Sequence, residues 1–180
     1  PDVLEQARAA ERALTSGEAV GALHGVPLTV KDTIEVRGLR ATAGSRVRAG
    51  FVPERDSLAV ARLRAAGAVI LGKTNCSEMA LEYTAENLVF GRTLNPHDAR
   101  RTPGGSSGGC AAAVSAGLTG GSLGSDLAGS IRIPAHFCGV TGLRPTAGRV
   151  PRDGNCLPVV GPYTLGASLE ELTRSGYPRE

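Results

Sequence analysis

Residues 104–134, which read GGSSGGCAAAVSAGLTGGSLGSDLAGSIRIP, constrain the fold of this 180-residue chain more than any other segment. Two serine sites, Ser106/Ser107 and Ser130, lie in separate glycine-rich turns on either side of an apolar stretch of small residues. Glycine lets backbone N–H groups approach a ligand closely because no Cβ intervenes. A flexible Gly/Ser linker is the alternative, but linkers do not usually contain a stretch such as AAAVSAGL. The segment therefore predicts an ordered site that carries serine hydroxyls.

The composition is that of one folded domain. A hydrophobic content of 41% and a charged content of 21% are ordinary for a globular protein of a length that can bury a sizeable core. Aromatic residues make up only 3%, and the net charge of +3 comes from scattered basic residues, so nucleic acid is not expected as a partner. The sequence has no secretory signal and no long apolar run, which predicts a cytoplasmic protein without a membrane partner.

Neither a metal nor a cofactor is expected. The chain has no CxxC pair, so a zinc or redox motif is not indicated, and reduced, partly buried thiols are the simplest account of Cys76, Cys110, Cys138 and Cys156. Residues 67–74 match the P-loop pattern GxxxxGK[ST] letter by letter. A phosphate loop needs a flexible segment between its glycines, whereas Ala-Val-Ile-Leu favours a strand. Nucleotide binding is therefore not favoured.

Apolar periodicity predicts helices that alternate with strands, an arrangement typical of an α/β fold. We expect strands over residues 26–30 and 68–71. We expect helices over 2–14, from the Asp56-Ser57 cap to Gly67, over 107–118 and over 168–174. Prolines at 145, 151 and 158 indicate a loop-rich segment.

A serine nucleophile needs a base, and none of the three histidines (His24, His97 and His136) lies in an obvious pairing motif. His136 is close to Ser130 in sequence, but a packed structural role is the more common one. Lysine is the alternative base, provided that its pKa falls toward neutrality by roughly 3 units, or about 4 kcal/mol. Lys31 follows the apolar run GVPLTV, where burial would lower its pKa. A lysine after a strand is usually exposed, so the residues alone leave Lys31 as one candidate.

Five blocks of the chain resemble those of the amidase signature family: GVPLTVKD, GAVILGKTN, RTPGGSSGG, GSDLAGSIRIPA and GLRPTAGRVP. They occur in the family's order and spacing over about residues 22–152. The resemblance implies an α/β/α fold with a mixed central sheet, in a single amidase domain over residues 1–180. It also implies a Ser–cis-Ser–Lys triad, in which Lys31 is the base, Ser106 the bridging serine and Ser130 the nucleophile.

The resemblance further implies an oxyanion hole made by the backbone N–H groups of Leu127, Ala128, Gly129 and Ser130. The family commonly has glycine where this chain has Ala128, and the N–H remains useful where the backbone angle suits a Cβ. Ser107 is expected to be structural, beside the triad. Asp126 and Arg132 flank the nucleophile, and an ion pair that steadies the turn is expected for them.

The implied function is hydrolysis of a small-molecule carboxylic amide through an acyl-enzyme on Ser130, with substrate-binding residues that the sequence does not identify. Amidotransferase A-type subunits of the family resemble the chain too. They usually carry a polar residue where this chain has Ile133, which favours a plain amidase. Family members are typically more than twice as long, so the C-terminal side of the fold is expected to be missing or shortened. A non-catalytic scaffold or subunit is therefore the alternative, and exposed core would favour a homo-oligomer.

Overall fold

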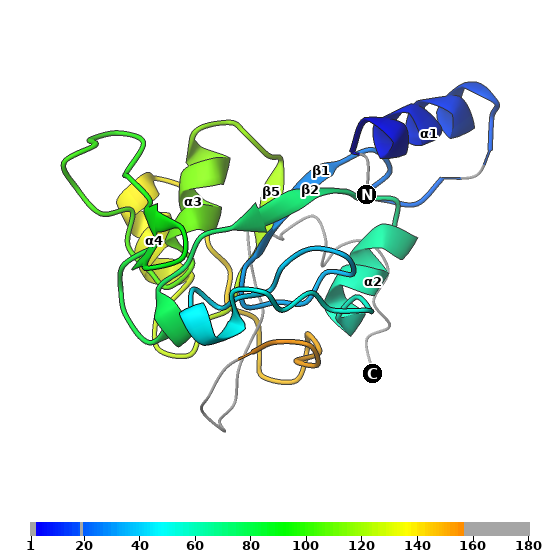
Figure 1. Ribbon diagram of the computed structural model, residues 1–180. Coiled ribbons are helices and arrows are strands. Elements are labelled where there is room, and N and C mark those ends of the chain that lie inside the picture. The colour runs from blue at the N-terminus through cyan, green and yellow to red at the C-terminus, as the bar shows by residue number, and fades with distance from the viewer. Residues whose placement is uncertain (1–2, 19, 157–180) are drawn as a thin grey trace.

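The computed structural model describes residues 3–18 and 20–156 (Figure 1). It confirms the α/β class, because helices alternate with the strands of a parallel sheet. The helices of the described part are α1 (Val3–Thr15), α2 (Leu58–Ala65), α3 (Gly108–Ser115) and α4 (Arg132–Cys138), with 3₁₀ turns η1 (Arg46–Arg48) and η2 (Glu78–Ala80). Its strands are β1 (Pro27–Lys31), β2 (Val69–Thr74), β3 (Glu86–Asn87), β4 (Gly91–Arg92) and β5 (Gly121–Leu123).

The central sheet has the strand order β2–β1–β5, and within residues 3–18 and 20–156 all its pairings are parallel. Lys31, the last residue of β1, lies opposite Thr74, the last residue of β2, and Val30 lies opposite Leu123 of β5. Parallel strands end at one edge of a sheet, so the loops that follow the three strands meet there. This edge is where open α/β sheets usually bind ligands. Strands β3 and β4 form a separate antiparallel pair.

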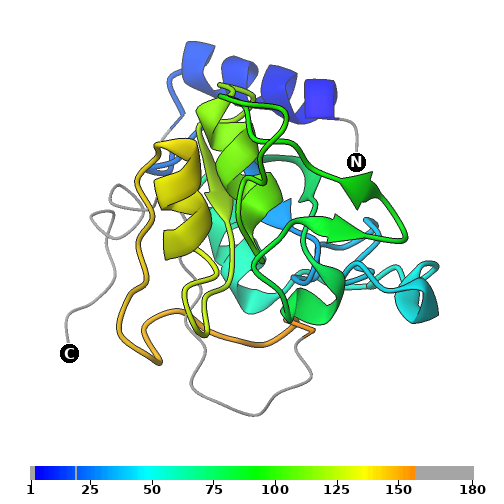
Figure 2. The same ribbon diagram turned by 90° about the vertical axis from the view of Figure 1, so that its left-hand side faces the viewer.

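The two faces of the sheet differ in chemistry, because successive side chains of a strand point to opposite faces. Leu28 and Val30 face an apolar core shared with α2; its other buried members are Leu23, Ile34, Val36, Ala59, Val60, Leu63, Ala68, Ile70 and Leu123. Thr29 and Lys31 point to the other face, where the Thr29 hydroxyl donates to Ser122 Oγ (2.9 Å). Helix α3 covers this polar face, and Figures 1 and 2 show α2 and α3 on opposite sides of the sheet.

The strands and helices expected from periodicity are present as β1, β2, α1, α2 and α3, each within a few residues of its expected bounds. Ser57 caps α2 by accepting a hydrogen bond from the Val60 N–H (3.3 Å). Strand β2 continues through Gly72, Lys73 and Thr74, so these residues do not form a phosphate loop. The helix expected over 168–174 lies outside the described residues. None of the helices described is long and apolar enough to cross a membrane.

Helix α3 packs closely against the end of β2, and Gly109 is the residue that permits this. A Cβ at Gly109 would lie 2.5 Å from both the backbone N and the backbone O of Asn75, and the Gly109 N–H donates to that same oxygen (3.1 Å). The approach brings the Cys110 thiol to 2.9 Å from Thr74 Oγ1.

We expect Gly109→Ala to lower the free energy of unfolding by about 1–3 kcal/mol, because overpacking against backbone outweighs the better helix propensity of alanine. Urea denaturation measures this change. Gly50→Ala is the matched control, since no atom lies within 4 Å of a Cβ there and the change should stay within about 0.5 kcal/mol. Equal stability of the two variants would contradict the close packing of α3.

Candidate active site

Lys31 ends β1 with its side chain fully enclosed, at 0% exposure. Its Nζ donates to Ser106 Oγ (2.6 Å) and to Ser125 Oγ (3.0 Å), both of which are buried hydroxyls. Burial lowers the pKa of Lys31 below its ordinary value, while the nearby carboxylate of Asp126 opposes this shift. The result is an amine that loses its proton more readily than an ordinary lysine, next to a serine hydroxyl.

Ser106 is positioned by a turn that only glycine fits. A Cβ at Gly105 would overlap the carbonyl oxygen of Thr84, and Gly104 has a φ of +81°, in the left-handed region. The Gly105–Ser106 peptide bond is cis. Helix α3 begins two residues later, so the hydroxyl of Ser106 lies at the helix start and faces the end of β1.

Hydrogen bonds join the segment of Ser130 to this group of serines. The Ser107 N–H donates to the carbonyl oxygen of Ser130 (3.0 Å), and the Ser107 hydroxyl donates to the Ser125 carbonyl (3.1 Å). Ser107 thus has the structural place expected for it. Ser130 itself is 7% exposed, more than the 1% of Ser106. The three sequence-predicted residues Lys31, Ser106 and Ser130 therefore belong to one cluster of loops at the carboxyl edge of the sheet.

Asp126 organises the loop before Ser130. Its buried carboxylate accepts hydrogen bonds from the N–H groups of Gly129 (2.8 Å) and Ile131 (3.1 Å), and from Arg132 Nε and Nη2 (3.0 Å each). Burial acts to raise the pKa of Asp126, but the hydrogen bonds from Arg132 and the backbone outweigh it and hold the pKa at about 2. The expected ion pair with Arg132 is present, and Arg144 Nε adds a second at 3.5 Å.

The backbone N–H groups expected in the oxyanion hole are not equivalent. That of Gly129 is engaged by Asp126, whereas those of Leu127, Ala128 and Ser130 have no acceptor among the residues described. The non-glycine residues of positive φ in the described chain are Ala43, Met79 and Ala80. Ala128 is not one of them, so its backbone angle suits a Cβ and the substitution of alanine for the common glycine leaves the N–H in place.

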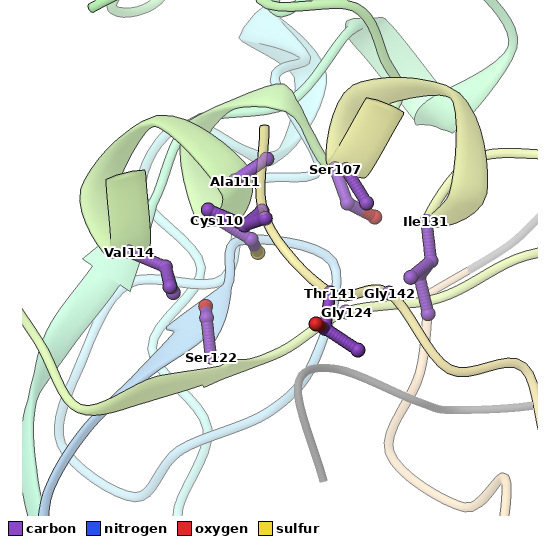
Figure 3. A pocket seen from close by; sticks show the side chains of 11 residues that line it. Ser107, Cys110, Ala111, Val114, Ser122, Gly124, Ile131, Thr141 and Gly142 are labelled. Carbon is purple, nitrogen blue, oxygen red and sulfur yellow. The ribbon is translucent and has the colours of Figure 1, made fainter. Parts of the chain in front are cut away.

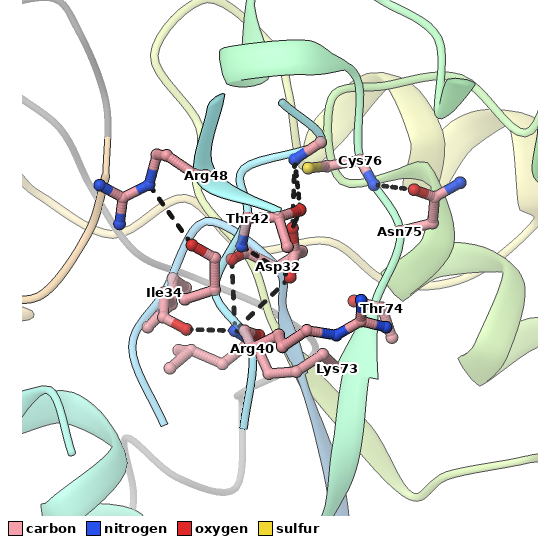
Figure 4. A network of polar contacts seen from close by, with 12 residues as sticks. Asp32, Ile34, Arg40, Thr42, Arg48, Lys73, Thr74, Asn75 and Cys76 are labelled. Atoms are coloured by element: carbon pink, nitrogen blue, oxygen red, sulfur yellow. Dashed lines mark hydrogen bonds and ion pairs between the residues drawn. The ribbon is translucent and has the colours of Figure 1, made fainter. Parts of the chain in front are cut away.

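A second polar network fixes the loop that follows Lys31 (Figure 4). The Asp32 carboxylate accepts from Thr42 Oγ1 (2.5 Å) and from the Gly44 N–H (3.1 Å). Lys73 Nζ donates to the carbonyl oxygens of Ile34 (2.6 Å), Asp32 (3.2 Å) and Arg40 (3.3 Å). Burial lowers the pKa of Lys73 to about 8, although Asp32 opposes the shift. The lysine of the P-loop-like pattern therefore clamps a loop of its own chain.

A small cavity lies behind the serines, between α3, β5 and α4 (Figure 3). Its volume of about 20 Å³ is enough for about one water molecule, and its lining includes Ser107, Cys110, Ser122 and Ile131. This space is too small for an amide substrate. Burial raises the pKa of the Cys110 thiol and raises that of Cys76 to about 12, so both thiols stay protonated and act as packing groups.

The histidines make their hydrogen bonds away from the cluster of Lys31, Ser106 and Ser130. His24 Nε2 lies 2.8 Å from the Ala10 carbonyl, and His97 Nε2 lies 2.9 Å from that of Cys138. The packed role expected for His136 is wrong, because its side chain is exposed on α4, with its ring centroid 6.1 Å from that of Phe137. The described residues contain no group of three or more His, Cys, Asp or Glu side chains that could hold a metal ion.

Two residues of the site were missed by sequence reasoning. Ser125 gives Lys31 its second hydroxyl partner, and the Tyr83 hydroxyl donates to the carbonyl oxygen of Ala128 (3.2 Å). Ser125 lies inside the glycine-serine block, which was the only signal for it. Tyr83 lies in no block at all, so the sequence held no sign of its contact.

Comparison with known proteins places the chain in a family. A family model described as Amidase matches residues 1–169, and the chain therefore belongs to the Amidase family. The resemblance to the amidase signature family is confirmed.

Curated relatives include the A-type subunits of glutamyl-tRNA(Gln) amidotransferases. The one from Synechococcus sp. (strain JA-2-3B'a(2-13)) is 50% identical over 174 residues, which are 94% of this chain and 34% of the relative. The one from Heliobacterium modesticaldum is 48% identical over 166 residues, which are 89% of this chain and 34% of the relative. The chain spans about a third of the length of these curated relatives.

Solved structures extend the likeness to amidases. The native peptide amidase from Stenotrophomonas maltophilia matches with a TM-score of 0.90 and 38% identity, over 100% of this chain and 39% of that one. The A-type subunit of the glutamyl-tRNA(Gln) amidotransferase from Thermotoga maritima matches with a TM-score of 0.79 and 41% identity, over 83% of this chain and 33% of that one. Amidases and amidotransferase subunits are thus both similar to the chain.

The low pKa of Asp126 makes the free energy of unfolding depend on pH. Its folded-state pKa of about 2 is below the ordinary value of 3.8, so the ionised carboxylate stabilises the fold above pH 4, and this contribution is lost as the pH falls through 2. The difference corresponds to about 2 kcal/mol. We expect Asp126→Asn to be less stable at pH 7 and to lose this component of the pH dependence, as measured by urea denaturation between pH 7 and pH 2. Glu54→Gln, at an exposed position, should keep it.

Proposed function

We propose that the chain carries the nucleophile and the base of an amidase, which hydrolyses a small-molecule carboxylic amide through an acyl-enzyme on Ser130. The observation that carries this proposal is the 2.6 Å contact between the fully buried Lys31 Nζ and Ser106 Oγ. Membership of the Amidase family supports it, as does the similarity to a peptide amidase. Lys31, Ser106 and Ser130 take the roles of base, bridging serine and nucleophile.

In the first half-reaction, Ser130 Oγ attacks the amide carbonyl carbon. The Ser130 proton passes to Ser106 Oγ as the Ser106 proton passes to the neutral amine of Lys31. The N–H groups of Leu127, Ala128 and Ser130, which have no acceptor among the described residues, are the donors proposed to bind the oxyanion, and one such donor is typically worth about 2.7–4 kcal/mol in the transition state. Gly129 shapes this loop, since its own N–H binds Asp126.

Collapse of the tetrahedral intermediate breaks the C–N bond. The proton returns from Lys31 through Ser106 to the leaving nitrogen, which departs as an amine or ammonia. Water then attacks the ester carbonyl of the acyl-enzyme and gives its proton to Lys31 by the same route. The carboxylic acid is released, and the proton held by Lys31 passes back to restore the hydroxyl of Ser130.

We further propose that residues 1–180 belong to a single amidase domain, with the motif core over about residues 22–152, which works in the cytoplasm with a small-molecule substrate. Exposed apolar side chains on the described surface favour self-association; they include Leu81, Leu88, Leu118 and Leu127. A homo-oligomer is accordingly part of the proposal.

A second candidate function is that of an amidotransferase A-type subunit. It is favoured by the curated relatives, one of which is 50% identical and is of this type. Ile133 disfavours the amidotransferase function, because those subunits usually carry a polar residue at this position. Release of ammonia from glutamine, compared with release from an apolar acyl amide, separates the two. Preference for glutamine would favour the amidotransferase role, and absence of both activities would favour a non-catalytic scaffold.

The triad assignment predicts covalent labelling. We expect one fluorophosphonate adduct on the purified protein by intact-mass measurement, and none on Ser130→Ala, which lacks the nucleophile. Lys31→Ala should abolish both the adduct and amide hydrolysis, because no base remains. Ser115→Ala is a suitable control, since Ser115 bonds to His97 and Cys138 instead of Lys31. Substantial activity of Ser130→Ala or Lys31→Ala would refute the triad assignment.

The buried lysine also predicts a pH profile. Protonated Lys31 cannot accept the serine proton, so kcat/KM should rise with pH to a plateau, with an apparent pKa below the ordinary lysine value of 10.5. In Ser125→Ala the ammonium form loses a hydrogen-bond acceptor, which should shift the rising limb to lower pH. If the rising limb of the pH profile keeps its position in Ser125→Ala, the group that titrates is not Lys31.

A further inference from the structure

The peptide unit between Ala128 and Gly129 is held at both of its polar ends. Its N–H donates to Asp126 Oδ1 (2.8 Å), and its carbonyl oxygen accepts a hydrogen bond from Tyr83 Oη (3.2 Å). The N–H and C=O groups of one peptide unit lie in one plane. Two anchors at its opposite ends therefore fix the rotation of this plane about the chain direction.

This peptide plane determines where the neighbouring N–H groups point. Those of Ala128 and Ser130 flank it, and neither has an acceptor within the described part of the protein. Gly129 has a φ of +113°, and a Cβ there would lie 2.7 Å from Ile133 Cδ1. Glycine is thus required at this position, yet glycine also gives the backbone the greatest freedom to rotate. Steric contacts within the loop are therefore not enough to fix its backbone, and hydrogen bonds from other residues are needed.

Tyr83 reaches the loop from a segment with a constrained backbone. Met79 and Ala80 are consecutive non-glycine residues with φ values of +50° and +57°, a combination that persists only where the surroundings enforce it. The Met79 N–H donates to the Ala43 carbonyl (2.7 Å), and the Ser77 hydroxyl donates to the Glu82 carbonyl (3.0 Å). These bonds hold the turn immediately before Tyr83.

The tyrosine side chain is not a core residue. It is 53% exposed, so its ring does not contribute the packing of a buried aromatic side chain, while its hydroxyl bonds to the loop. Asp126 and Arg132 act on the N–H side of the peptide unit. Among the described residues, Tyr83 supplies the anchor on the carbonyl side.

We propose that Tyr83 is a positioning residue for the oxyanion hole: its hydroxyl fixes the Ala128–Gly129 peptide, so that the N–H groups of Ala128 and Ser130 point at the developing oxyanion. This inference rests on the proposed amidase function. Tyr83 touches the backbone of the loop and acts through it. Its effect is therefore expected on transition-state stabilisation, with little effect on substrate affinity.

The test is Tyr83→Phe, which removes the hydroxyl and keeps the ring. The purified protein is treated with a fluorophosphonate, and the rate of adduct formation is followed by intact mass and normalised to the folded fraction. We expect this rate, and kcat for amide hydrolysis, to fall by about 10-fold to 100-fold, with KM changed less than about twofold. Glu86→Gln, at an exposed position three residues further along the chain, is the matched control and should react at the parent rate.

The outcomes separate the two proposals. A parent protein that forms no adduct overturns the amidase function and this inference with it. A reactive parent with an equally reactive Tyr83→Phe variant overturns the inference alone and leaves the triad in place. A rise in KM at unchanged kcat also overturns it, since that result would assign Tyr83 to substrate binding. A selective fall in labelling rate and kcat supports it.

Discussion

The Nζ of Lys31 is surrounded by hydroxyl oxygens and has no access to solvent, and the chemistry of the site depends on this. A carboxylate partner would hold the amine as a cation, but the nearby carboxylate of Asp126 is already bound by Arg132 and the backbone. Ser106 and Ser125 satisfy the N–H groups without adding negative charge. Desolvation therefore dominates and lowers the pKa, which shifts the lysine toward the neutral form that the proposed mechanism requires.

The division of the sheet into two faces lets the fold tolerate such a site. One face of β1 and β2 packs an apolar core against α2, and this core provides the hydrophobic stabilisation. The other face presents Thr29, Lys31 and Thr74 to α3, whose first turn is built of small residues. Gly109 lets that helix approach the backbone of Asn75, which encloses the hydroxyls and excludes water from the amine. The alternation of side chains along a strand thus places the apolar core on one face of the sheet and the polar site on the other.

Sequence patterns predicted the parts of the structure that are determined by residues close together in the chain. Periodicity predicted β1, β2 and the first three helices, and the motif blocks indicated Lys31, Ser106 and Ser130. Strand β5 was not predicted, because three residues are too few to show a periodic apolar pattern. Helix α4 was not predicted either, because Pro134 lies within it and proline usually interrupts a helix. Ser125 and Tyr83 could not be predicted, since their contacts join residues 94 and 45 positions apart and depend on how the loops meet at the sheet edge.

Two lysines at this edge show how environment, and not residue type, sets the role of a side chain. Lys73 pairs with Val30 in the register of β1 and β2, so it lies on the opposite face from Lys31. Its ammonium donates to three carbonyl oxygens and lies 3.9 Å from Asp32 Oδ1, and with a pKa of about 8 it remains mostly protonated at neutral pH. Lys31 has hydroxyl partners instead, and its burial lowers its pKa and shifts it toward the neutral form. One lysine can therefore hold the loop as a cation while the other, one position away in register, has the surroundings that the proposed role of base requires.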